Sequence, residues 1–116
     1  MHNFRKLKAW NASFTFTKEV YAVTNKFPKE EVFGLTSQIR RSAVSIPSNI
    51  AEGCGRGTDK QLMHFLDIAQ GSACELETQL LLAIEMTYMT KTEGNVLIQK
   101  LQEVQKMIQG FKKTLR

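Results

Sequence analysis

The chain has 116 residues, of which 42% are hydrophobic and 23% are charged, and its net charge is +5. This size and composition predict one domain, residues 1–116, that buries its own core without disulfides or a bound metal. The longest apolar run, residues 80–84, is too short to cross a bilayer. No apolar stretch follows the basic residues near the start, so we expect a cytoplasmic protein with no membrane contact. The charge favours polyanionic partners, but only mildly.

The first helix is expected over residues 3–26, because the residue before Pro28 leaves the helical region. It carries two apolar stripes on opposite faces. One stripe is Leu7, Trp10, Phe14 and Tyr21, and the other is Ala9, Phe16, Val20, Val23 and Phe27. A four-helix bundle buries one stripe per helix, so we expect the second stripe to contact another copy of the chain. The alternative is a deeply buried helix with an unusually wide apolar face.

The second helix is expected from Leu35 or Thr36 to Glu52, with a kink at Pro47. Its core stripe is Leu35, Ile39, Ala43, Ile46 and Ile50. Pro47 cannot donate to the Ala43 carbonyl, and serine and asparagine side chains within one turn are candidate donors. A second stripe is entirely polar and consists of Gln38, Arg41, Ser45, Asn49, Glu52 and Arg56. It fits either a packed network, with Glu52 paired to Arg41 or Arg56, or a phosphate-facing surface that includes Arg40.

Three glycines in residues 53–57 separate the second helix from the third. Thr58 and Gln61 predict a capping box at the start of the third helix, which should end at Tyr88 or Met89. Thr92 is expected to cap the fourth helix, which should end near Lys113. Short connections favour antiparallel neighbours. The predicted fold class is therefore all-α, an up-down-up-down antiparallel four-helix bundle without strands.

Few residues have the spacing that catalysis or metal binding requires. Gln61 occupies the position three before His64, where di-iron bundles carry glutamate. Cys54 lies near Arg56 and a helix start, which would lower a thiol pKa, but no histidine base adjoins it. The glycine-rich loop lacks the P-loop spacing, although amides at the start of the third helix could hold one phosphate of a polyanion. We predict a protein that is not an enzyme and needs no cofactor or metal.

The segment Gln38-Ile-Arg-Arg-Ser-Ala-Val-Ser-Ile-Pro-Ser-Asn-Ile-Ala-Glu-Gly53 resembles the bacterial four-helix-bundle proteins of the 23S rRNA intervening-sequence (S23-like) family. The resemblance continues through Trp10, Tyr21, Phe27, Pro28, Glu31, residues 33–35, Ala69, Gly71, Ser72, Glu75 and Glu77. A related branch, the accessory proteins of diversity-generating retroelements, forms pentameric basic rings that bind nucleic acid beside a reverse transcriptase. The resemblance therefore implies a non-enzymatic, oligomeric, nucleic-acid-associated protein.

We expect a homo-oligomer, preferably a pentamer, that binds RNA or DNA mainly through phosphates, with a reverse transcriptase or another protein as a further candidate partner. The candidate contacts are Arg5, Lys6, Lys8, Arg40, Arg41, Arg56, Lys112 and Lys113. The first and last clusters, the latter with Arg116, should merge because both lie at one end of the bundle. The alternative is a protein-binding adaptor without nucleic-acid affinity. An enzyme that uses Cys54, or a ligand pocket near Arg41, Asn49 and Glu52, is the least favoured.

Overall fold

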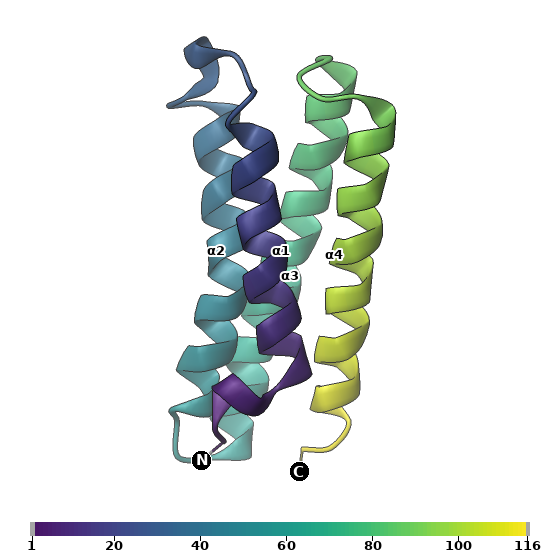
Figure 1. Ribbon diagram of the computed structural model, residues 1–116. Coiled ribbons are helices and arrows are strands. Elements are labelled where there is room, and N and C mark those ends of the chain that lie inside the picture. The colour runs from purple at the N-terminus through teal and green to yellow at the C-terminus, as the bar shows by residue number, and fades with distance from the viewer. Residues whose placement is uncertain (1, 116) are drawn as a thin grey trace.

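The computed structural model describes residues 2–115, which contain four α-helices, two short 3-10 helices and no strand. The helices are α1 (Lys8–Thr24), α2 (Leu35–Cys54), α3 (Asp59–Glu85) and α4 (Lys91–Lys112). Each helix packs against the next along the chain, and α1 also packs against α4. Figure 1 shows the resulting up-down-up-down arrangement, with both ends of the chain at the same end of the bundle. The all-α fold class is confirmed. Among residues 2–115, no helix is both long enough and apolar enough to cross a membrane.

The first helical segment is interrupted, and the prediction of one helix over residues 3–26 was wrong. A separate 3-10 helix, η1 (Phe4–Lys6), precedes α1, and Leu7 between them is extended with φ −84° and ψ 131°. The Asn11 side chain stabilises this break, because its Nδ2 donates to the carbonyl oxygens of Arg5 at 2.8 Å and Leu7 at 2.9 Å. As a result η1 packs back against α1 and α2.

The stripe of α1 that we expected to contact another copy lies in the core instead. Ala9, Phe16, Val20 and Phe27 are buried, whereas Phe14 and Tyr21 of the other stripe are exposed. Two buried hydroxyl residues complete the core-facing stripe, Ser13 and Thr24. Their hydroxyls donate to the carbonyls of Trp10 at 3.0 Å and Val20 at 2.8 Å, so their burial leaves no donor unpaired.

Helix α2 continues through Pro47 and ends at Cys54, two residues later than predicted. Its isoleucine stripe is fully buried, as predicted. The Ala43 carbonyl, which loses its usual partner because proline has no N–H, accepts a hydrogen bond from the Thr17 hydroxyl of α1 at 3.2 Å. The donor therefore comes from a neighbouring helix and not from a serine or asparagine of α2. The kink itself stays a prediction.

Both later helices begin with a side-chain cap. The Thr58 hydroxyl accepts from the Gln61 N–H at 3.2 Å, as expected. The Gln61 Oε1 accepts from the Thr58 hydroxyl at 3.3 Å and not from the Thr58 N–H, so the predicted capping box is only half formed. Helix α4 is capped by Thr90 and not by the predicted Thr92. The Thr90 hydroxyl accepts from the Glu93 N–H at 3.0 Å, and the Glu93 carboxylate accepts from the Thr90 N–H at 3.0 Å. This reciprocal pair of hydrogen bonds satisfies two amides at the start of the helix. Thr92 lies inside the first turn of α4 and is not the capping residue.

The α3–α4 connection is compact, and α3 ends at Glu85, earlier than predicted. Thr87 adopts a left-handed conformation with φ 61°, which helical residues do not. Gly94 in the first turn of α4 is buried against the Ile84 side chain, and a Cβ at this position would overlap it. Glycine is required here because the two helices approach closely.

Candidate nucleic-acid interface

Segments far apart in the sequence meet at the end of the bundle that carries both chain ends. The His2 N–H donates to the Cys54 carbonyl at 3.3 Å, and the His2 ring lies edge-on to Phe111 with centroids 5.4 Å apart. These two contacts fix the first residues against the ends of α2 and α4. The basic clusters at the two ends of the sequence therefore share one end of the molecule (Figure 1). Arg116, expected to extend the second cluster, lies outside the described residues.

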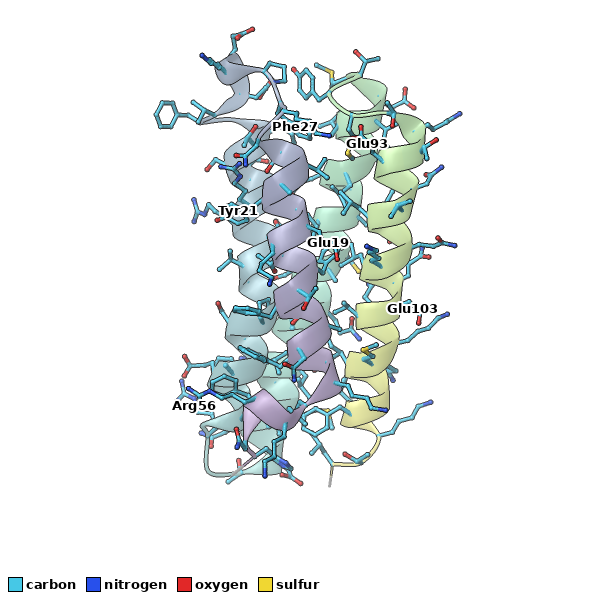
Figure 2. The ribbon with its side chains drawn as sticks, in the orientation of Figure 1. Glu19, Tyr21, Phe27, Arg56, Glu93 and Glu103 are labelled. Carbon is cyan, nitrogen blue, oxygen red and sulfur yellow. The ribbon has the colours of Figure 1, made fainter. Side chains whose placement is uncertain are left out.

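We call this region the basic end. Its basic side chains are Arg5, Lys6, Lys8, Arg56, Lys60, Lys112 and Lys113, and its acidic side chains are Glu52, Asp59 and Asp67. The opposite end carries Lys26, Lys29 and Lys91 with Glu30, Glu31, Glu85 and Glu93. Figure 2 shows Arg56 and Glu93 at the two ends. The molecule is 43 Å long, several times the screening length of roughly 8 Å at physiological salt, so a charge close to the surface is influenced mainly by the end that is nearer to it.

Some of the basic side chains predicted to contact phosphates at the basic end already form salt bridges, and others do not. Arg56 pairs with Glu52 at 3.0 Å, and Lys112 pairs with Asp67. The remaining predicted contacts at this end are exposed or partly exposed and form no salt bridge with a described residue: Arg5, Lys6, Lys8 and Lys113. These four side chains can meet phosphates without first breaking an ion pair.

Arg40 and Arg41 lie away from the basic end and have different environments. The Arg40 Nε donates to Thr24 Oγ1 at 2.9 Å, and its Nη2 donates to Asn25 Oδ1 at 2.9 Å. Its guanidinium also lies over the Tyr21 ring, 4.6 Å from the centroid. Arg40 therefore ties α2 to the end of α1 and has little capacity left for a ligand. Arg41 is exposed and has no partner among the described residues, but the structure does not bring it to the other candidates.

The polar stripe of α2 forms a packed network. Asn49 Nδ2 donates to the Ser45 carbonyl at 2.8 Å and to the Ser45 hydroxyl at 2.9 Å. The Ser45 hydroxyl shares a hydrogen bond of 2.8 Å with Ser72 of α3. Arg41 lines a polar hollow of about 320 Å³ between α2 and α3, whose lining includes neither Asn49 nor Glu52. The pocket suggested for these three residues is therefore not formed.

Cys54 is fully buried, and burial raises the pKa of its thiol. This shift is opposite to the lowered pKa that a nucleophile would need, because an apolar environment disfavours the thiolate. Within residues 2–115, no three His, Cys, Asp or Glu side chains are grouped as a metal site would require.

Sequence reasoning missed an aromatic group at the basic end. Trp10 and Phe14 are stacked with ring centroids 4.9 Å apart, and Phe4 of η1 contacts Trp10 at 5.0 Å. The prediction that the second stripe contacts another copy left the Trp10 stripe for the core, and the two stripes of α1 are similarly apolar. Hydropathy does not identify the buried stripe, because the hydroxyl residues Ser13 and Thr24, which continue it, count as polar.

A family model described as 23S rRNA-intervening sequence protein matches residues 5–110. The chain belongs to this family. Membership in the 23S rRNA-intervening sequence protein family confirms the resemblance found in the sequence, while the relation to retroelement accessory proteins stays a prediction. The fold is similar to that of a protein of unknown function from the S23 ribosomal protein family of Bacteroides thetaiotaomicron VPI-5482. That crystal structure has a TM-score of 0.83 and 24% identity, and the match covers 90% of this chain and 98% of the other. No curated protein matches the sequence.

Proposed function

We propose that the protein is a non-enzymatic homo-oligomer that binds RNA or DNA through phosphate contacts at its basic end. The observation that supports this proposal is the gathering of unpaired basic side chains there, Arg5, Lys6, Lys8 and Lys113. A polyanion that meets these groups gains charge-assisted hydrogen bonds without displacing an internal carboxylate. It also releases condensed counterions, which favours binding.

The proposal predicts a steep salt dependence. Four phosphate contacts give a slope of about −3 in a plot of log affinity against log salt concentration. Raising the salt from 50 to 200 mM should therefore weaken binding roughly 100-fold. Fluorescence anisotropy with a labelled RNA strand and a labelled DNA duplex measures this loss directly.

A matched pair of variants tests the location of the contacts. Replacing Lys6 and Lys8 by alanine removes two exposed charges from the basic end, and replacing Lys29 and Lys91 removes two from the opposite end. The first variant should bind more weakly, with a salt slope less steep by nearly two, while the second should match the parent protein. An equal loss of nucleic-acid affinity in both variants, or no binding by the parent protein at 50 mM salt, would contradict the proposal.

Self-association is supported by two unlike apolar surfaces away from the basic end. Phe33, on the α1–α2 connection, is 95% exposed, and Leu81, Leu82 and Met86 near the end of α3 are each about half exposed. Two different patches favour a head-to-tail contact between copies. Such a contact gives a ring, such as the expected pentamer, when the rotation between neighbouring copies closes. A ring axis parallel to the helices would place every basic end on one face, and so multiply the phosphate contacts.

Light scattering at micromolar protein concentration tests the ring, and a monomer would refute it. Phe33→Ser and Leu82→Ser should each break the head-to-tail contact. Mixing the two variants should restore one intact interface per pair, which yields a dimer and not a ring.

The alternative function is a protein-binding adaptor, for which the 95% exposure of Phe33 also argues. In that case Phe33 would dock a different protein, for example a reverse transcriptase. A protein that stays monomeric and binds neither RNA nor DNA at low salt would favour this function.

A further inference from the structure

Three aromatic side chains at the basic end form a continuous ladder. Phe4 meets Trp10 at 5.0 Å with an interplanar angle of 60°, and Trp10 stacks on Phe14 at 4.9 Å with an angle of 24°. The ladder exists because the chain breaks at Leu7 and folds η1 back against α1. Phe14, at the end of the ladder, is 47% exposed. The stack therefore ends in a ring that solvent can reach.

Two cations contact the rings of this ladder. The Arg5 guanidinium lies 5.0 Å from the Phe4 ring centroid, and the Lys18 ammonium lies 6.0 Å from the Phe14 ring centroid. Lys6 and Lys8 lie in the same segment, and the sequence contains no acidic residue before Glu19. An apolar surface bordered by cations that form no salt bridge with a described residue matches a partner that offers both flat rings and negative charge.

We propose that the ladder is a stacking platform for unpaired bases of single-stranded RNA or DNA, an inference that rests on the proposed function. Phosphate contacts alone do not favour a single strand over a duplex, because both carry phosphates. A duplex hides the faces of its bases, whereas a single strand can stack a base on the Phe14 ring once Lys18 moves off it. The flexible Lys18 side chain then moves from the ring to the neighbouring phosphate, and Arg5, Lys6 and Lys8 follow the backbone.

A second copy of the chain is the other possible occupant, and the charges disfavour it. A protein surface laid over the ladder would bury Arg5, Lys6 and Lys8, which form no salt bridge with a described residue, and burying unpaired charges is costly. A nucleic-acid strand neutralises the same cations. Other exposed apolar residues lie away from the basic end, at Phe33 and along the end of α3, and are better placed to contact another copy.

Trp10 makes the inference directly testable, because it is the only tryptophan in the chain. Intrinsic fluorescence is measured while the full-length protein is titrated with short oligouridylate or oligothymidylate, and with a DNA duplex of equal length, at 50 mM salt. The single strands should quench Trp10 and bind at least about fivefold more tightly than the duplex, since stacking contributes about 1–3 kcal/mol per base.

Phe14→Leu keeps an apolar side chain but removes the ring. It should weaken single-strand binding about fivefold or more while leaving duplex binding, the salt slope and the melting temperature unchanged. Val96→Ala, which shortens an exposed apolar side chain of α4 away from the basic end, is the control and should change neither affinity.

Equal affinity for single strand and duplex with unchanged Trp10 fluorescence would overturn the stacking platform but leave phosphate binding intact. Absence of binding to either nucleic acid would overturn both proposals. If Trp10 fluorescence follows protein concentration and not added nucleic acid, the ladder is a contact between copies, and the inference is likewise overturned.

Discussion

Thr17→Val tests how the protein accommodates a proline inside α2. The Thr17 hydroxyl has one proton, which it shares between the Ser13 carbonyl at 2.7 Å and the buried Ala43 carbonyl at 3.2 Å. Valine has nearly the same shape, so the substitution removes the donor and leaves the packing intact. Pro47 has no N–H, and the Ala43 carbonyl is then left without a partner. Because the hydroxyl bonds mainly to Ser13, we expect the lower part of the usual cost, about 1 kcal/mol.

A double-mutant cycle isolates this effect. Pro47→Ala restores a backbone N–H that can donate to Ala43, so the Thr17 hydroxyl becomes unnecessary. Thr17→Val should therefore cost about 1 kcal/mol in the parent protein and close to nothing in the Pro47→Ala background. In the parent protein the loss corresponds to a fall in melting temperature of about 4 °C.

Urea unfolding followed by helical circular dichroism, at one fixed protein concentration, measures all four corners of the cycle. An equal loss in both backgrounds would refute the reasoning, because the Thr17 hydroxyl would then stabilise the fold through Ser13 or packing alone.

Three further predictions follow from single sites. Gly94→Ala should lower the free energy of unfolding by about 1–3 kcal/mol through overpacking. Gly71→Ala, with nothing within 4 Å of the new methyl group, should raise the free energy of unfolding by about 0.5–1 kcal/mol. Chemical denaturation compares the two variants, and a loss of stability in both would contradict the packing argument. Hydrogen bonds from Lys26 and the Thr90 amide lower the pKa of Glu93 from 4.5 to about 2. Its stabilising contribution is therefore complete above pH 4.5 and is lost as the pH falls toward 2, so melting temperatures of Glu93→Gln should fall less over this range than those of the parent protein. Exposed Cys74 should react quickly with a thiol reagent and buried Cys54 only on unfolding; two equally fast thiols in the native protein would contradict the assigned burial.

The α2 core was predictable because Ile39, Ile46 and Ile50 recur at helical spacing with no competing apolar stripe on that helix. Helix α1 was not, because two stripes of similar hydrophobicity compete and the buried one contains Ser13 and Thr24. Both hydroxyls bond to carbonyls of their own helix, so they enter the core at little cost. A hydropathy pattern counts them as polar and so selects the wrong face.

The candidate interface shows a similar division. The meeting of the two terminal basic clusters follows from the topology alone, since an even number of antiparallel helices returns the chain to its starting end. The roles of Arg40 and Arg41 did not follow. The two arginines are neighbours in sequence, but only Arg40 has side-chain partners among the described residues. These partners are Thr24 and Asn25, at the end of α1. No local pattern in α2 indicates which of the two arginines is engaged.

The separation of charge along the bundle gives the molecule an electric dipole parallel to its helices. A nearby polyanion exerts a torque on that dipole before any contact forms, so the protein should arrive with its basic end first. This orientation restricts the encounters to productive ones and raises the association rate, an effect that added salt removes as the screening length shortens. The charge layout therefore acts on the approach to the partner as well as on the contact.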